Sequence, residues 1–273
     1  MLLRIETEVE PTELRRLVAH IEQSWRLLGE TEPHFSVLTD PRYKADQIDA
    51  TREAFYASGQ FDLRRWQEAA ARSGVELPKH GTCLELGCGV GRITMWLAKS
   101  FHRVIGVDIS SAHLDLARKN MGELRNVELR LGNDLDAIAR LPRIDFFCSV
   151  IVLQHNPPPI IRWLLMTILS KLKPGGMAIF QVPTVLPNYR FVTQDYLANP
   201  PAVGTMEMHA IPHDAVADIV TLVGCEVVEA REYDCIGIEN GKSIEFLVRR
   251  RPSLVHSFRS HVSRLLGNTL APR

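Results

Sequence analysis

The stretch Leu84-Glu85-Leu86-Gly87-Cys88-Gly89-Val90-Gly91-Arg92 decides the fold class of this chain. Three glycines alternate with other residues, directly after a short apolar run and directly before a helical pattern at 93–98. A tight turn at the end of a first strand needs residues without a Cβ where backbone approaches a ligand, and the following helix directs free N–H groups at that ligand. The stretch therefore predicts a strand, a turn that binds a nucleoside or a carboxylate, and a helix.

Short apolar runs and helical segments alternate from residue 82 onward, which is typical of a doubly wound parallel sheet. The run at 146–153 is apolar on both faces, as expected for a central strand that is covered on each side. We predict an α/β fold with seven mostly parallel strands, at 82–87, 103–108, 127–131, 146–152, 177–182, 226–232 and 243–249. The last two resemble a closing antiparallel pair. Lys173-Pro174-Gly175-Gly176 predicts a turn before the fifth strand.

The residues before position 80 show helical periodicity instead of strands. Apolar side chains recur at three- and four-residue steps from Leu14 to Leu28, and residues 46–57 and 63–73 also indicate helices. We expect a helical cap at 1–80, an α/β domain at 81–250 with an irregular insertion at 183–210, and a basic tail at 251–273. A long irregular insertion is often functional.

Carboxylates follow the second and third predicted strands. Asp108 ends the second strand, seventeen residues beyond Gly91, and a carboxylate there can accept hydrogen bonds from both hydroxyls of a ribose. Asp134 follows the third strand, where it can cap the next short helix. Asp108 alone could also cap a helix, but together with the glycine turn it indicates a nucleoside site.

The GxGxG turn with Glu85 before it resembles motif I of the class I S-adenosylmethionine-dependent methyltransferases. The dinucleotide fingerprint GxGxxG would place its third glycine at position 92, which is Arg92. The resemblance is close over 82–182 and looser over 211–249. It implies S-adenosyl-L-methionine as the cofactor, and binding residues Glu85, Gly87, Cys88, Gly89, Gly91, Arg92, Asp108, Ile109, Asn133, Asp134, Leu135 and Gln154.

The same resemblance places the end of the fourth strand opposite the methyl group, which makes His155 a candidate general base because a histidine pKa near 6.5 suits proton transfer. His155 can alternatively only hydrogen-bond the cofactor or the proline turn at 157–159. His209, in the insertion, is a second catalytic candidate; its alternative is a surface position. Water exclusion by a closing cap would assist either residue.

The composition limits the partners. Lysine and arginine number 32, as do aspartate and glutamate, so no net field favours nucleic acid. Asn156-Pro157-Pro158 is followed by Pro159 instead of the aromatic residue that amino methyltransferases acting on nucleic acid carry. No apolar run is long enough for a membrane span. Five cysteines without a CxxC pair indicate a reduced compartment, and we expect a cytoplasmic location.

These features favour methyl transfer to an O or N nucleophile of a small-molecule acceptor, without a metal. They do not indicate an oligomeric state. The alternatives are a nicotinamide-dependent oxidoreductase, which the early third glycine disfavours, and a methyltransferase-like module that only binds partners.

Overall fold

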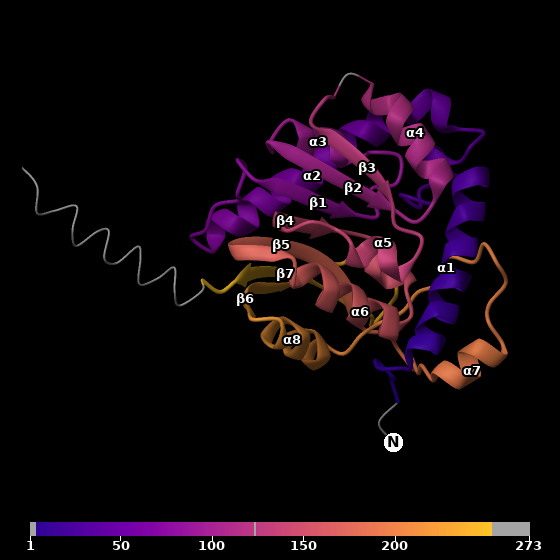
Figure 1. The fold of residues 1–273 in the computed structure, drawn as a ribbon. Coiled ribbons are helices and arrows are strands. Elements are labelled where there is room, and N and C mark those ends of the chain that lie inside the picture. Colours follow the sequence, from indigo (N-terminus) through magenta and orange to yellow (C-terminus); the bar gives the residue numbers. More distant parts are fainter. Residues whose placement is uncertain (1–3, 123, 253–273) are drawn as a thin grey trace, which may run out of the picture.

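Seven strands form one sheet between two layers of helices in the computed structural model, which describes residues 4–122 and 124–252 (Figure 1). The strand order is β3-β2-β1-β4-β5-β7-β6, and the first five strands are parallel. β7 is antiparallel to β5 and β6, which confirms the predicted closing pair. The strands are β1 (Thr82–Leu86), β2 (Arg103–Asp108), β3 (Val127–Leu131), β4 (Ile144–Ser149), β5 (Leu172–Val185), β6 (Cys225–Glu232) and β7 (Lys242–Arg250).

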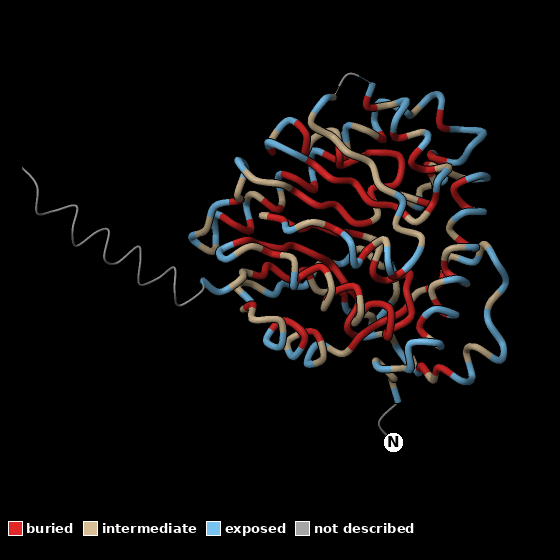
Figure 2. Tube along the Cα trace, viewed as in Figure 1, coloured by how far each residue is buried: buried red, intermediate tan, exposed pale blue. Residues whose placement is uncertain are grey.

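Helices cover both faces of the sheet. Within the described residues these are α1 (Pro11–Thr31), α2 (Ile48–Arg72), α3 (Thr94–Ala98), α4 (Ser111–Met121), α5 (Leu135–Ala139), α6 (Pro158–Leu169), α7 (Thr193–Ala198) and α8 (His213–Leu222), with 3₁₀ turns at Pro41–Tyr43 and Leu153–His155. In Figure 1, α2, α3 and α4 lie on one face and α5, α6 and α8 on the other. The central strands β1, β2, β4, β5 and β7 are largely buried, whereas the edge strands β3 and β6 are mostly half-buried or exposed (Figure 2). None of these helices is long and apolar enough to cross a membrane.

Helix α1 runs across the carboxyl edge of the sheet and connects the two faces. Pro11 occupies its first turn, and Glu10 and Glu13 cap it reciprocally. Its buried residues Leu14, Leu17, Ile21 and Leu28 follow the helical spacing expected from the sequence. The helix contacts α4 near one end and α6 and α7 near the other, so it lies over the strand ends. α1 is thereby positioned to cover a ligand bound at this edge.

Helix α2 differs from the prediction, which divided it into segments at 46–57 and 63–73. The structure has one continuous helix. Gly59, in the gap between the two predicted segments, is buried in the helix because α2 packs very closely against the glycine turn: a Cβ on Gly59 would lie 2.1 Å from the carbonyl oxygen of Arg92. The glycine permits close packing and does not end the helix.

Two predicted strand boundaries were also wrong. The fourth strand was expected at 146–152 but ends at Ser149, because Ile151 adopts a left-handed backbone conformation with φ of 57°. The expected turn at 173–176 is instead part of β5, whose pairing with β4 shifts between Ile144 and Phe146. A register shift of this kind accommodates the extra residues without leaving the strand. Residues 253–273 of the basic tail lie outside the described residues.

Candidate active site

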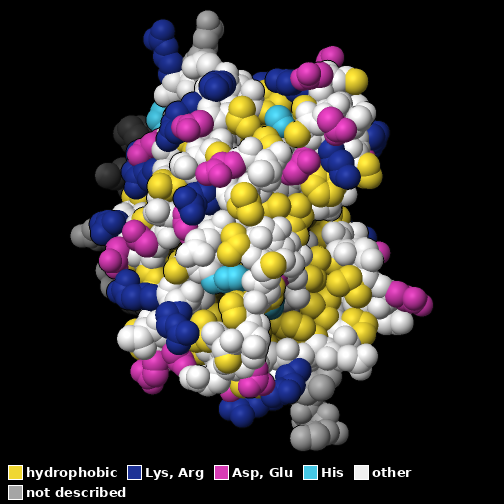
Figure 3. All heavy atoms as spheres, turned by 90° about the vertical axis from the view of Figure 1, so that its right-hand side faces the viewer, with side chains coloured by type: hydrophobic (Ala, Val, Ile, Leu, Met, Phe, Trp, Pro, Cys, Tyr) yellow, Lys and Arg dark blue, Asp and Glu magenta, His cyan; other side chains and the backbone are white. Residues whose placement is uncertain are grey.

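A pocket opens where β1, β2, β3 and β4 end, covered by α1. This edge pocket contains about 1010 Å³ of empty space, including the part open to solvent. Helix α1 contributes Val18, Ile21 and Trp25 to its wall. Figure 3 shows the face that carries α1, on which hydrophobic side chains gather along the middle with charged side chains around them. Open α/β sheets bind ligands at such an edge.

The glycine turn forms the floor of the edge pocket. The backbone N–H groups of Gly87 and Cys88 donate to the carbonyl oxygen of Val107, at 2.7 and 3.0 Å, so the turn is fixed against β2. Gly87 has φ of 72°, and a Cβ there would lie 2.2 Å from Val152. Gly89 has φ of 52°, and its Cβ would lie 2.5 Å from Val37. Both positions therefore require glycine, for conformation and for space.

The Asp108 carboxylate is fixed at the end of β2, inside the edge pocket. Its Oδ2 accepts a hydrogen bond from the N–H of Gly89 at 2.8 Å, and its Oδ1 accepts one from the N–H of Ser110 at 2.9 Å. The side chain is 6% exposed. One hydrogen bond thus joins the glycine turn directly to the carboxylate that the sequence assigned to a ribose.

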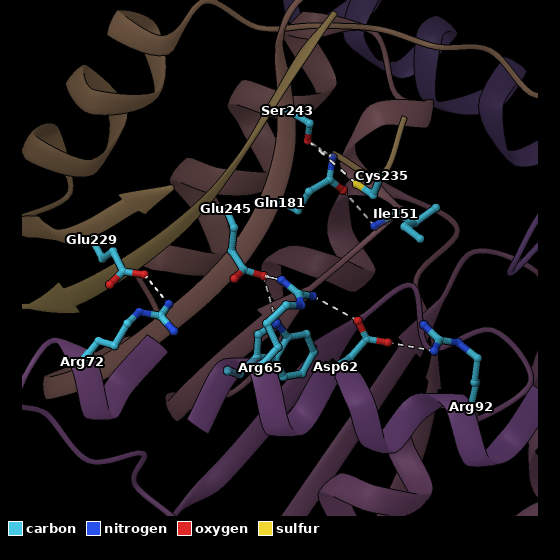
Figure 4. A network of polar contacts seen from close by, with 11 residues as sticks. Asp62, Arg65, Arg72, Arg92, Ile151, Gln181, Glu229, Cys235, Ser243 and Glu245 are labelled. Atoms are coloured by element: carbon cyan, nitrogen blue, oxygen red, sulfur yellow. Dashed lines mark hydrogen bonds and ion pairs between the residues drawn. The ribbon is translucent and has the colours of Figure 1, made fainter. Parts of the chain in front are cut away.

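Glu85 and Arg92 lie at the inner end of the pocket. Thr94 donates its hydroxyl hydrogen bond to Glu85 Oε2 at 2.6 Å, and burial raises the pKa of Glu85 to about 8. Arg92 forms an ion pair with Asp62 of α2 at 2.8 Å (Figure 4). The Nε of Arg92 is buried and has no hydrogen-bond partner among the described residues. An unsatisfied buried donor of this kind costs free energy unless a ligand satisfies it.

Arg92 belongs to a polar network that joins α2 to the sheet (Figure 4). Asp62 lies between Arg92 and Arg65, and its contact with Arg65 is 3.0 Å. Arg65 also pairs with Glu245 of β7, which accepts a 3.1 Å hydrogen bond from the indole of Trp66. The ion pairs are largely buried, so α2 is held firmly against the turn.

The remaining cofactor candidates divide into two groups. Ile109, Leu135 and Asp134 line the edge pocket together with the residues above. Asp134 is also the N-cap of α5, since its Oδ1 accepts from the N–H of Ala137 at 2.6 Å, so the structure shows its capping role. Three candidates lie outside the lining: Gly91, Asn133 and Gln154. Cys88, by contrast, lines it.

The segment after β4 is strained where it enters the pocket. Ile151, a β-branched residue, has φ of 57°, which is rare and costs roughly 1–3 kcal/mol. The buried Gln181 of β5 holds it, because Gln181 Oε1 accepts from the N–H of Ile151 at 2.9 Å. Gln181 Nε2 donates to Ser243 at 2.6 Å (Figure 4). It also donates to Gln154 at 3.1 Å, so the contact between Gln154 and β5 helps to fix the segment after β4.

The two catalytic candidates lie together in a second polar cluster, outside the lining of the edge pocket. His155 packs against Trp25 with ring centroids 5.0 Å apart, and its Nδ1 donates to the carbonyl oxygen of Glu207 at 2.7 Å. His209 Nε2 lies 3.0 Å from the Glu207 carboxylate, and its Nδ1 lies 2.7 Å from the hydroxyl of Tyr189. Trp25 borders both the cluster and the pocket.

Burial and pairing give the groups of this cluster different protonation. Burial lowers the pKa of His155 to about 4, so its ring is neutral at pH 7. Burial alone would raise the pKa of Glu207, but hydrogen bonds from His209 and Tyr196 hold it below its ordinary value. Glu207 is therefore a carboxylate, and it accepts a hydrogen bond from Nε2 of His209 at 3.0 Å.

Several lining residues were missed by the sequence analysis. Ser36 and Val37 come from the loop after α1, His113 from the first turn of α4, and Trp163 from α6. The position of His113, five residues after Asp108 at a helix start, was the one available signal. Ser36 had none, because its proximity depends on how α1 packs.

Comparison with known proteins gives the family. Residues 83–176 match the family model described as a methyltransferase domain. The chain carries a class I S-adenosylmethionine-dependent methyltransferase domain. The matched range includes the glycine turn, Asp108 and the end of β4, so the edge pocket belongs to the methyltransferase domain.

Curated relatives match over about half of the chain. A probable cobalt-precorrin-6B C(15)-methyltransferase from Methanothermobacter thermautotrophicus is 31% identical over 124 residues, which are 44% of this chain and 60% of that protein. A ribosomal RNA small subunit methyltransferase C from Alcanivorax borkumensis is 28% identical, over 49% of this chain and 42% of its own. A ubiquinone biosynthesis O-methyltransferase from Coxiella burnetii is 28% identical, over 48% and 56%. The chain thus spans between 42% and 60% of these relatives' lengths.

Solved structures match over a larger part of the chain. Magnesium protoporphyrin IX methyltransferase from Synechocystis, solved with bound S-adenosylmethionine, has a TM-score of 0.54 at 15% identity, covering 90% of this chain and 99% of that one. A putative methyltransferase from Bacillus halodurans has a TM-score of 0.51 at 18% identity, covering 70% and 99%. At these identities the likeness shows the fold.

The residues of the edge pocket fit this domain's cofactor on structural grounds. The two glycines leave a cradle that a Cβ would fill, and the Asp108 carboxylate lies at its side. The orphaned Nε of Arg92 offers a donor for an anionic group. The Arg92 donor suits the carboxylate of the cofactor, and the Asp108 carboxylate suits its ribose. The exposed backbone of the glycine turn suits a methionine chain that passes close to it.

Proposed function

We propose that this chain transfers the methyl group of S-adenosylmethionine to an oxygen or nitrogen nucleophile of a small metabolite. One observation carries the proposal: the N–H of Gly89 fixes the Asp108 carboxylate beside the glycine turn, which leaves space for a ligand to lie close to the protein backbone. The sulfonium of the bound cofactor supplies an activated methyl group. The protein therefore has to hold the nucleophile in line, exclude water and accept a proton.

Three charged side chains account for cofactor binding in this proposal. Arg92 directs its free Nε to the cofactor carboxylate, while Asp62 holds the rest of the guanidinium. Asp108 accepts a hydrogen bond from a ribose hydroxyl through Oδ2. Asp134 uses Oδ1 to cap α5 and presents its other oxygen to the adenine amino group. Glu85 stays protonated at pH 7 because its pKa is about 8, and its buried side chain supports the glycine turn.

The small-metabolite acceptor is supported by the walls of the edge pocket. Trp25, Trp163, Ile160 and Leu164 make the side under α1 and α6 apolar, and α1 covers it. A duplex or a folded RNA would need α1 displaced and a basic surface, whereas the net formal charge is zero. Two of the matched relatives carry names of cofactor-biosynthesis methyltransferases, which also favours a metabolite.

Calorimetry with S-adenosylhomocysteine tests the proposal. We expect the wild-type protein to bind it and D108A to lose at least about tenfold in affinity, since a charge-assisted hydrogen bond contributes about 1.5–3 kcal/mol. NADH is the comparison ligand. Binding of NADH without binding of S-adenosylhomocysteine would indicate the oxidoreductase, and binding of neither would indicate a module without a cofactor.

We further propose that His209 is the general base and that His155 positions it. Glu207 stabilises the imidazolium that His209 forms on taking a proton, whereas His155 stays neutral and holds the Glu207 backbone through its Nδ1. Trp25 packs against His155 and lines the edge pocket, so in this proposal the acceptor displaces this indole to reach the cluster that contains His209.

Radiolabelled methyl transfer to a panel of phenols, sugars and amines identifies a working acceptor for the test. With it, H209N should lower kcat by about 100-fold or more and abolish the acidic limb of the pH profile. H155N should raise KM or weaken folding while leaving that limb in place. If the pH profile of H209N keeps its acidic limb, His209 is excluded as the base.

A further inference from the structure

We infer that Ser36 and His113 are positioning residues that orient Asp108 for the cofactor ribose and connect ribose binding to the loop that follows α1. The inference rests on the proposed function, because it concerns the same cofactor. It assigns a task to two buried polar side chains that methyl transfer itself does not use.

The three side chains form a hydrogen-bonded chain. The Oγ of Ser36 lies 2.9 Å from Nε2 of His113, and Nδ1 of His113 lies 3.4 Å from Oδ1 of Asp108. Ser36 is 3% exposed, His113 1% and Asp108 6%. A neutral imidazole satisfies both contacts when Nδ1 carries the proton for Asp108 and Nε2 accepts from the Ser36 hydroxyl.

The contacts of Asp108 explain why a third donor matters. Its two oxygens can accept about four hydrogen bonds. The N–H groups of Gly89 and Ser110 take one on each oxygen, and His113 takes a second on Oδ1. One further hydrogen bond can therefore be accepted, by Oδ2, on the side of the edge pocket that Asp108 lines. His113 therefore prevents the carboxylate from rotating and keeps this oxygen directed at a ribose hydroxyl.

The packing of the loop after α1 connects the same residues to the cap. Val37, next to Ser36, lies where a Cβ on Gly89 would contact it at 2.5 Å. At the end of α1, a Cβ on Gly29 would lie 2.2 Å from the Ser110 hydroxyl and 3.4 Å from the His113 ring. The cap thus touches the glycine turn and the start of α4 at once. Loss of this packing would break the Ser36 contact and free the His113 ring.

The test compares two ligands on matched variants. The ligands are S-adenosylhomocysteine and its 2′,3′-dideoxy analogue, which lacks the ribose hydroxyls, and binding is measured by calorimetry. H113L removes both contacts of the imidazole. H113N places an amide N–H near the former Nδ1 and keeps a donor for Asp108. S36A removes only the outer contact, and H102L changes an exposed histidine outside the pocket.

We expect H113L to weaken S-adenosylhomocysteine by about tenfold, the value of one charge-assisted hydrogen bond, and to leave the dideoxy analogue unchanged. H113N should recover most of the loss, S36A should lose about threefold to fivefold, and H102L should match the wild type. Equal weakening of both ligands in H113L, or an unchanged affinity in both H113L and S36A, would overturn the inference. If H113L does not fold, S36A and H113N test the inference, again by comparing the affinities for S-adenosylhomocysteine and for its dideoxy analogue.

A wild-type protein that does not bind S-adenosylhomocysteine would overturn the proposed function and this inference together. Wild-type binding with insensitive variants would overturn only the inference, so the two failures are distinguishable.

Discussion

Glu85 is a carboxyl group enclosed beneath the glycine turn, and its environment connects pH to stability. Burial raises its pKa to about 8 in the folded protein, against about 4.5 in an unfolded chain. The folded state therefore binds this proton more tightly. The stability that results is complete below about pH 4.5 and is lost as the pH rises through about 8.

We expect E85Q, which remains neutral, to remove this pH dependence. The unfolding free energy of the wild type relative to E85Q should fall steadily between pH 5 and 8, by at most about 1.4 kcal/mol per pH unit. Urea unfolding without cofactor at several pH values measures it. E128Q is the control, since Arg130 and Arg103 hold the pKa of the exposed Glu128 below its ordinary value and it does not titrate in this window. Parallel curves for wild type and E85Q would contradict the assigned burial.

Gly89 allows a second test at the level of one residue. G89A places a Cβ 2.5 Å from Val37 at a φ of 52°, so both strain and a clash result. G74A is the matched control, because Gly74 has φ of 66° and nothing within 4 Å of its Cβ. Both variants should lose about 1 kcal/mol from strain. Only G89A should also lose S-adenosylhomocysteine affinity; equal affinities would show that Val37 yields without cost.

The sequence predicted those site residues whose position depends on chain connectivity alone. Gly87, Gly89 and Asp108 follow strand ends directly, and parallel strands bring their carboxyl ends to one edge. Ser36 and His113 meet across 77 positions of the chain, and nothing local to either residue indicates the contact. Gly91, Asn133 and Gln154 were expected to bind the cofactor but lie outside the edge pocket's lining, and the side chain of Gln154 hydrogen-bonds Gln181 instead.

At the scale of elements, α2 is fixed to the domain by buried charges. Asp62 accepts from Arg92 at 2.8 Å and from Arg65 at 3.0 Å, and the side chains of Asp62 and Arg92 are 11% and 6% exposed. The sequence predicted two separate helical segments, at 46–57 and 63–73, and Gly59 lies in the gap between them, a residue type that disfavours helix interiors. Here tertiary packing against Arg92 outweighs that preference, which is why composition alone misplaced the boundary.

Substitution of Asp62 tests how firmly α2 is attached. D62N leaves the Arg92 guanidinium buried without a full counter-charge, which should cost about 3 kcal/mol and lower Tm by roughly 5–10 °C. D49N breaks the Asp49–Arg52 pair on the same helix, whose side chains are 92% and 51% exposed. It should cost less than about 1 kcal/mol. Thermal unfolding followed by circular dichroism compares them, and equal Tm values would show that the buried pair does not hold α2.

At the scale of the whole molecule, the two cap helices have different relations to the edge pocket. α2 lies against one face of the sheet, attached by ion pairs to Arg92. α1 crosses the carboxyl edge and lines the pocket with Val18, Ile21 and Trp25. We expect a ligand of the size of a nucleoside to enter by movement of α1 or of the loop that follows it. The sequence suggested one lid of several helices; the contacts favour one moving helix and one fixed helix.

The attachment of α1 indicates which end moves. Its N-terminal side is tied to the insertion, where Ile5 pairs with Phe191 and Glu6 accepts from the N–H of Thr193 at 2.8 Å. Its C-terminal side is held by the close packing of Gly29 on Ser110 and by two side-chain hydrogen bonds of the following loop, Ser36 to His113 and His34 to Tyr56. The contacts at the C-terminal side are easier to break than the backbone bridge between Ile5 and Phe191. Opening should therefore begin at the loop after α1.

Hydrogen exchange with and without S-adenosylhomocysteine measures this directly. At a ligand concentration 100 times Kd, amides of residues 25–40 should exchange up to about 100-fold more slowly, because closure becomes linked to binding. Amides of residues 60–70 in α2 should exchange at the same rate in both conditions, and D108A, with a Kd at least about tenfold higher, should show at least about tenfold less protection of residues 25–40 at the same concentration. Equal protection of both segments would mean that α1 and α2 move as one rigid cap. Protection of neither would mean that the cofactor enters past a static α1, through the open side of the pocket near Asp134.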